Sequence, residues 1–131
     1  NLIEIIREFT DLKYHEKLRE ASIECLGKLM KSYPEIFDYI VKFLNDKSFR
    51  VRRAVVKALE ELGEEKCIAY LDEVIKYDLD GRVVRKAKEA KYKINLKLKS
   101  KVEINNLANE IEKLKKENEE LKAKIYSLEK K

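Results

Sequence analysis

A 33-residue repeat constrains the fold of this 131-residue chain more than any other feature. When the sequence is shifted by 33 positions, three segments align, each with an aliphatic residue, an arginine and an alanine at the same spacing. The aligned residues are Leu18, Val51 and Val84; Arg19, Arg52 and Arg85; and Ala21, Ala54 and Ala87. Apolar residues around them recur at steps of three and four, which predicts an amphipathic helix in each segment. A repeat of this period predicts a stack of similar helical units.

A second apolar segment follows each of the first two repeated helices. Pro34 opens one of these segments, and Gly63 ends the helix before the other. The residues expected to be buried are Phe37, Ile40, Val41 and Leu44; Ile68, Leu71, Val74 and Ile75; and, in an opening segment that resembles the second helix of an incomplete repeat, Leu2, Ile3, Ile5, Ile6 and Phe9. Paired helices that cannot bury their apolar faces alone must stack. The predicted fold class is therefore all-α, with helical-hairpin repeats forming an α-solenoid over residues 1–100.

The repeated polar and small residues have an expected structural role. A small alanine at the same position of each helix allows neighbouring helices to approach closely. The repeated arginine is expected to be held by an acid from a neighbouring turn, such as Asp46 or Asp78. A ligand-binding role for these arginines stays open as the alternative.

Residues 101–131 carry a different pattern, a heptad with Ile at the a positions and Leu at the d positions. The predicted dimer interface consists of Ile104, Leu107, Ile111, Leu114, Asn118, Leu121, Ile125 and Leu128. Ile at a with Leu at d favours two strands, and one Asn at an a position fixes register and dimeric state. We expect a parallel homodimer joined by a coiled coil in this segment, although a lone amphipathic helix packed on its own domain is the alternative.

The charges beside the heptad seam favour the parallel arrangement. In a parallel dimer each g position faces the next e position of the partner. These pairs are Glu110 with Lys115, Glu117 with Lys122, and Lys124 with Glu129, and all three are attractive. Each exposed pair contributes at most ~1 kcal/mol, so the pairs select direction more than they add stability.

The stretch from Arg82 to Lys101 holds nine Lys or Arg and one Glu, and it leads into the heptad. A basic helix before a zipper is the order found in basic-zipper proteins, so a nucleic-acid-binding dimer is the alternative function. An apolar stripe through Val84, Ala87, Ile94 and Leu98 instead predicts that one face of this helix is buried. After Gly81 no Gly or Pro interrupts the sequence, which favours one long helix or two with a joint near residues 99–101.

Composition excludes several classes of protein. The chain has one histidine and two cysteines without metal-ligand spacing, so we expect buried, reduced thiols in a cytoplasmic protein. No apolar run approaches the ~20 residues that span a bilayer. Richness in Lys and Glu is typical of thermophile proteins. The chain begins at Asn1 without Met, and we expect it to be part of a longer protein.

The run Asp46-Lys-Ser-Phe-Arg-Val-Arg-Arg-Ala-Val-Val-Lys-Ala-Leu-Glu-Glu-Leu-Gly63 resembles a HEAT repeat of the short, phycocyanobilin-lyase-like kind. The continuation that ends in Asp78-Leu-Asp-Gly-Arg-Val-Val-Arg-Lys-Ala87 is similar to the C-terminal domain of archaeal zinc aminopeptidases, relatives of puromycin-sensitive and tricorn-interacting enzymes. The resemblance implies a non-catalytic interaction and dimerisation scaffold, with protein partners or its own catalytic domain beside it, and zinc only in a parent catalytic domain.

The chain departs from that family in its chemistry. The family binds zinc through H-E-x-x-H, in which two histidines on one helix face hold the metal and a glutamate activates water. This sequence has no H-E-x-x-H, so no catalytic, cofactor-binding or metal-binding residue can be assigned. An independent enzyme of the lyase kind is the third hypothesis, and no Cys–His pair or paired carboxylate supports it.

Overall fold

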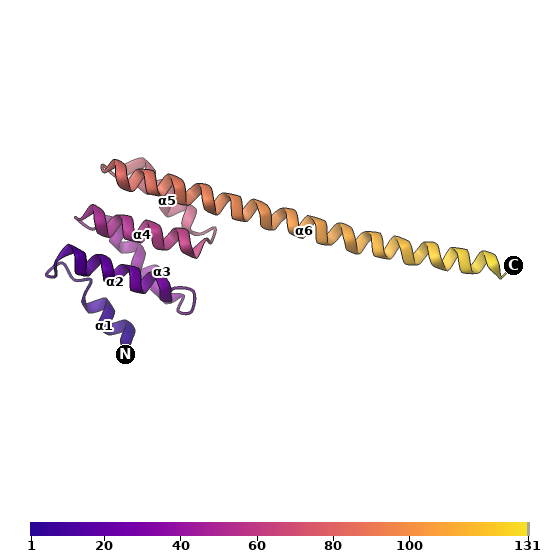
Figure 1. Cartoon of the computed structure of the whole chain (residues 1–131), viewed down its shortest axis with the longest axis horizontal. Helices are drawn as coiled ribbons and strands as arrows, with labels where there is room; N and C mark the ends of the chain where they lie inside the picture. The colour runs from indigo at the N-terminus through magenta and orange to yellow at the C-terminus, as the bar shows by residue number, and fades with distance from the viewer. Residues whose placement is uncertain (131) are drawn as a thin grey trace. The chain divides into compact units, whose positions relative to one another are not determined.

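Helices make up all the regular structure of residues 1–130, the part of the chain that the computed structural model describes (Figure 1). The elements are α1 (Leu2–Glu8), α2 (Glu16–Leu29), α3 (Glu35–Ile40), the 3-10 helix η1 (Val41–Asn45), α4 (Phe49–Leu62), α5 (Cys67–Tyr77) and α6 (Gly81–Glu129). The predicted all-α class, with helical hairpins and a long C-terminal helix, is confirmed. The contacts divide the chain into two units, Asn1–Leu96 and the residues from Lys97 onward.

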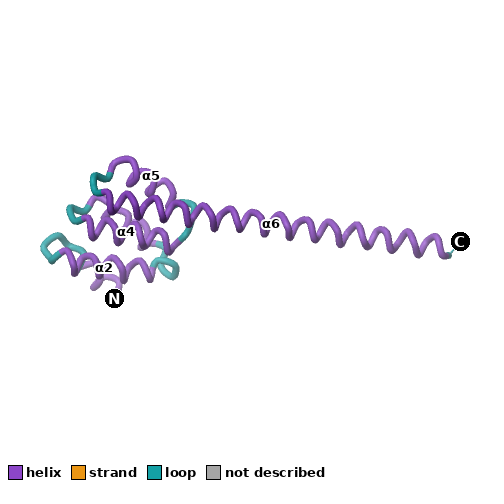
Figure 2. Tube along the Cα trace, turned by 45° about the horizontal axis from the view of Figure 1, so that its top comes forward, coloured by secondary structure: helices purple, strands orange, loops and turns teal. Residues whose placement is uncertain are grey.

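The first unit is built from hairpins stacked in chain order. α2 pairs with α3, which leads into η1, and α4 pairs with α5. Short loops join the helices, as Figure 2 shows. α2 packs along α4, and η1 packs against α4 as well, so α4 lies at the centre of the unit. The repeated helices therefore form one layer and the second helices of the hairpins form another, as an α-solenoid requires.

Polar caps and one glycine set the bounds of these helices. The Ser48 hydroxyl oxygen accepts the Arg50 N–H at 3.2 Å and starts α4. Gly63 ends α4 with φ 65°, the left-handed conformation that glycine adopts without a Cβ penalty. Pro34 is the N-cap of α3, where its missing N–H costs nothing.

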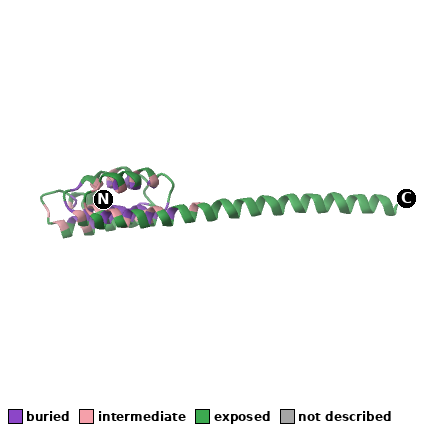
Figure 3. Cartoon of the chain, turned by 90° about the horizontal axis from the view of Figure 1, so that it is seen from above, coloured by how far each residue is buried: buried purple, intermediate pink, exposed green. Residues whose placement is uncertain are grey.

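The core of the first unit lies between the layers, where Ile23, Leu26, Val51 and Leu59 are fully buried. Figure 3 shows this burial gathered on the facing sides of the helices. α2 and α4 approach so closely at Gly27 that a Cβ there would lie 2.8 Å from the Cβ of Ala58. The chain therefore needs its smallest residues at this crossing.

The repeated alanines are not all equivalent. Ala54 and Ala87 are buried, as close helix packing requires. Ala21 is exposed, which differs from the expectation. In α4, the side that carries the corresponding alanine packs against α2. In α2, the same side has only the short α1 nearby, and α1 does not bury Ala21.

The second helices are less buried than the sequence pattern predicts. Phe37 and Ile40 are buried on α3, but Val41 and Leu44, in the 3-10 helix that follows, are only half-buried and line an open hollow. On α5, Leu71 and Val74 are buried, whereas Ile68 and Ile75 are half-buried. α1 has no buried residue at all.

The two cysteines differ, which corrects the prediction that both thiols are buried. Cys67 is fully buried at the start of α5, and burial raises the pKa of its thiol. Cys25 is exposed. Its counterpart 33 residues on is Ala58, which packs against α2, whereas the corresponding side of α2 has no such neighbour within residues 1–130.

This difference predicts selective labelling of the native protein. A maleimide or disulfide reagent at neutral pH should modify Cys25 quickly, because its thiol reaches solvent. Cys67 should react only after denaturation, since burial blocks access and its raised pKa lowers the fraction of reactive thiolate. Thiol counting before and after adding urea checks this. If both thiols of the native protein reacted at the same rate, the packing of α5 would be contradicted.

Candidate functional site

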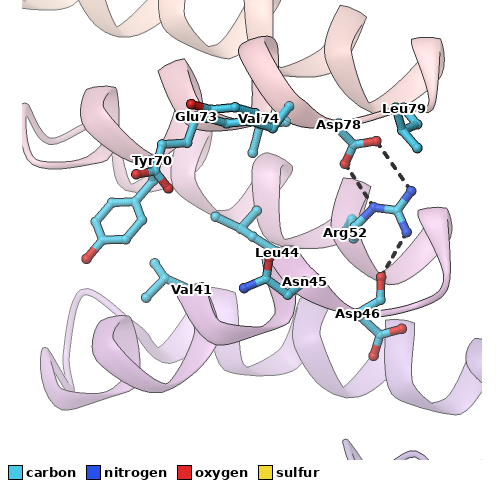
Figure 4. Close-up of a pocket in the computed structure, with 11 residues that line it drawn as sticks. Val41, Leu44, Asn45, Asp46, Arg52, Tyr70, Glu73, Val74, Asp78 and Leu79 are labelled. Atoms are coloured by element: carbon cyan, nitrogen blue, oxygen red, sulfur yellow. Dashed lines mark hydrogen bonds and ion pairs between the residues drawn. The ribbon is translucent and has the colours of Figure 1, made fainter.

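A hollow with a volume of about 560 Å³ lies between η1 and α5 in the first unit. We call it the η1–α5 groove. Its lining residues are Val41, Leu44, Asn45, Asp46, Arg52, Tyr70, Glu73, Val74, Tyr77, Asp78 and Leu79. Figure 4 shows aliphatic side chains from both elements facing the hollow, with the Arg52–Asp78 pair at one end. The groove thus combines aliphatic side chains with polar ones, among them Glu73 and the Arg52–Asp78 pair.

Arg52 ties the elements around this groove together. Its Nε donates to Asp78 Oδ2 at 2.9 Å, and its Nη2 donates to Asp78 Oδ1 at 3.3 Å. Its Nη1 donates to the backbone carbonyl oxygen of Asp46 at 2.8 Å (Figure 4). One guanidinium therefore joins α4, the turn after η1 and the turn after α5.

Arg19 forms a similar set of contacts one repeat earlier, and its side chain is more deeply buried than that of Arg52. Its Nη2 donates to Asp46 Oδ1 at 3.0 Å, and its Nη1 donates to the Tyr14 carbonyl oxygen at 2.7 Å. The side chains of Arg19 and Asp46 are only 2% and 1% exposed. Asp46 Oδ1 also accepts the Ser48 N–H at 2.8 Å, which fixes the turn into α4. The expected pairs of the repeated arginines with Asp46 and Asp78 are thus both present.

Arg85, the third repeated arginine, differs from the other two. It is exposed, and no carboxylate of residues 1–130 lies within ion-pair distance of it. The chain does not turn back after Arg85, because α6 continues as a helix to Glu129. Within residues 1–130, no following hairpin turn supplies the aspartate that Arg19 and Arg52 each receive.

The basic stretch belongs in part to the packing of the first unit. On α6, Val83, Ala87, Ala90 and Ile94 are buried, so one face of this helix is occupied. Several of its lysines form ion pairs: Lys91 with Asp72 at 2.6 Å, and Lys86 and Lys93 both with Glu60, at 3.3 and 3.4 Å. Sequence reasoning missed Glu60 as their shared partner. Part of the positive charge of this helix is therefore paired within the first unit.

The heptad positions are exposed along the second unit of the single chain. The exposed fractions of the seven Ile and Leu residues at the a and d positions lie between 54% and 69%. Every residue from Lys99 to Lys130 is exposed, as the C-terminal part of α6 in Figure 3 shows. α6 is continuous across residues 99–101, so of the two alternatives the single long helix is the one found.

Three ionisable groups outside the groove, Asp80, Arg82 and Glu16, have shifted pKa values because of hydrogen-bond partners. The hydrogen bond from the Arg82 guanidinium lowers the pKa of Asp80 to about 2, and Asp80 in return raises the pKa of Arg82. The hydrogen bond from the Ser48 hydroxyl lowers the pKa of Glu16. Across the described residues, no group of three or more His, Cys, Asp or Glu is placed to hold a metal ion.

None of the helices in the described part of the chain is long and apolar enough to cross a membrane. A family model described as HEAT repeats matches residues 2–90, about two thirds of the chain. A search of curated proteins finds no match.

Proposed function

The chain belongs to the HEAT-repeat family, and on that premise we propose that it is a non-catalytic scaffold for protein–protein interaction that dimerises through α6. The proposed division is a solenoid over residues 1–100 and a coiled-coil helix over residues 101–131. The two parts have different tasks. The solenoid presents surfaces to other proteins, and the helix brings two solenoids together.

The observation that carries the dimer is the exposed apolar seam. Burying an exposed Leu or Ile side chain contributes ~1.5–3 kcal/mol, and seven such side chains repeat along one stripe of α6. A charge pair at the g and e positions contributes at most ~1 kcal/mol. The seam therefore sets the affinity of the dimer, and the pairs Glu110–Lys115, Glu117–Lys122 and Lys124–Glu129 set its direction.

Asn118 supports the parallel, in-register arrangement. It is the one polar residue at an a or d position between Ile104 and Leu128. Its amide both donates and accepts hydrogen bonds, so two copies satisfy each other when they lie face to face. Only a parallel dimer in register brings Asn118 opposite Asn118; a shifted register would bury each amide against Ile or Leu at a cost of ~1–3 kcal/mol.

Disulfide trapping tests this arrangement. In a Cys25→Ser background, Asn118→Cys should form an interchain disulfide under mild oxidation, because both copies of position 118 lie at the seam. Ala123→Cys is the matched control, since position 123 falls at the outermost heptad position, f, and the two copies point apart. Non-reducing gel electrophoresis reports the result. Equal cross-linking at both positions, or at neither, would contradict a parallel dimer in register.

A parent enzyme is the finer part of the proposal. We infer from the resemblance that this domain belongs to a zinc aminopeptidase, whose catalytic domain would supply the metal. The purified chain itself should not hydrolyse aminoacyl-arylamide substrates in the presence of zinc, because it lacks H-E-x-x-H. Hydrolysis by the purified chain would overturn the non-catalytic role. Two free thiols fit a reducing compartment, which supports a cytoplasmic location.

A further inference from the structure

A small basic hollow lies between α4 and the first turns of α6, on the first unit. Its volume is about 180 Å³, and its rim consists of Arg53, Arg82, Arg85, Lys86 and Glu89. Four of these side chains are cationic and one is anionic. We call this surface the arginine rim.

Two of the four cations are fixed by partners on the protein itself. Arg82 donates to Asp80 through Nε at 3.0 Å and through Nη2 at 2.8 Å, and its guanidinium carbon lies 3.5 Å from the ring centroid of Phe49. Lys86 forms ion pairs with Glu60 at 3.3 Å and with Glu89 at 3.7 Å. These contacts neutralise the charges of Arg82 and Lys86 within the protein. They also hold both side chains in place at the hollow.

The other two cations are free to bind a ligand. Arg53 and Arg85 are exposed, and neither has a carboxylate within ion-pair distance among residues 1–130. They come from different helices and share one hollow. Two guanidinium groups that line one hollow make a suitable receptor for oxyanions, because each presents a planar fork of N–H donors.

The repeat indicates which kind of oxyanion the hollow would bind. Arg85 occupies the position that Arg19 and Arg52 hold in the preceding repeats. Each of those arginines binds the carboxylate of an aspartate, at 3.0 and 2.9 Å respectively. Arg85 is the one member of the series for which the described chain supplies no such carboxylate, so an aspartate or glutamate from another molecule completes the pattern.

We propose that the arginine rim binds an acidic segment of a partner protein, with carboxylates of that segment on Arg85 and Arg53. The inference rests on the proposed role as an interaction scaffold, and it names the chemistry of one partner. It is independent of the coiled coil, because every residue of the rim precedes Lys97.

Binding of a fluorescein-labelled peptide of alternating Glu and Gly to the full chain tests the proposal. Fluorescence anisotropy at about 0.15 M salt keeps screening at a physiological level. The double variant Arg53→Gln/Arg85→Gln should lose at least about tenfold in affinity, the scale expected for removing charge-assisted hydrogen bonds. The control variant Lys17→Gln/Lys31→Gln removes the same amount of charge from exposed positions elsewhere. Its affinity for the peptide should stay within about twofold of that of the unchanged chain.

Three outcomes would overturn the proposal. The peptide could bind no better than its Gln–Gly counterpart, or both double variants could lose affinity equally, which would mean a net-charge effect. Binding of duplex DNA or of inorganic phosphate could require the two arginines while binding of the acidic peptide does not. Circular dichroism should show that both double variants keep the fold. Disulfide trapping at position 118 should be unchanged, so loss of the peptide site and loss of the dimer are distinguishable.

Discussion

Asp46→Asn should destabilise the first unit by about 3 kcal/mol or more, the loss expected when one partner of a buried ion pair is removed. The substitution keeps the size of the side chain and an oxygen that can accept the Ser48 N–H. It removes only the negative charge that faces Arg19, which is 2% exposed and cannot reach water without opening the core. The charge of Arg19 is then left buried without a counter-ion.

Urea unfolding followed by circular dichroism measures this loss, with both proteins at the same concentration because the proposed dimerisation would add to apparent stability. Glu64→Gln is the matched control. Glu64 pairs with Lys66 at 3.5 Å, but both side chains are about half exposed, so the change should cost less than ~1 kcal/mol. Equal midpoints for the two variants would show that the Arg19–Asp46 pair does not hold the repeats together.

Leu114→Lys should abolish the dimer at micromolar concentrations. Leu114 is a d position at the middle of the seam, and each dimer loses two such side chains. At ~1.5–3 kcal/mol for each buried leucine, the loss is roughly 3–6 kcal/mol, or about a hundredfold to ten-thousandfold in Kd. The charges introduced at the seam add the cost of burying two unpaired ammonium groups.

Ala123→Lys is the control for this prediction, because it adds the same charge at the outermost heptad position. Analytical ultracentrifugation over a range of concentrations should find the control as associated as the unchanged chain, and Leu114→Lys dissociated. A Leu114→Lys variant that associates as well as the control would place the interface outside the heptad seam.

Much of the first unit could be predicted because its signals are local and repeated. The 33-residue spacing predicts the helices, and the turns between the repeats contain Asp46 and Asp78 as acids that could hold the repeated arginines; the structure pairs them with Arg19 and Arg52. A single Gly63 marks the end of α4 because only a residue without Cβ adopts φ 65° at no cost.

Other features depend on what lies beside a residue, and a periodic pattern does not reveal that. The η1–α5 groove is lined on one side by the 3-10 helix that begins at Val41, and no residue in that run signals the change of helix type. Cys25 and Ala21 fit the apolar and small positions of the repeat, yet both are exposed because that side of α2 is left open. The arginine rim was missed for a related reason, since Arg53 and Arg85 line one hollow only when α4 and α6 lie side by side.

The measurement that tests the central claim most directly is the mass of the unchanged chain in solution, by size-exclusion chromatography with multi-angle light scattering. A scaffold joined through α6 should elute with twice the chain mass of 15.5 kDa at micromolar concentrations. Truncation after Ser100 should return the mass to that of one folded solenoid. An unchanged chain with the mass of a monomer, or a truncated chain that stays dimeric, would contradict the proposal that α6 joins two copies.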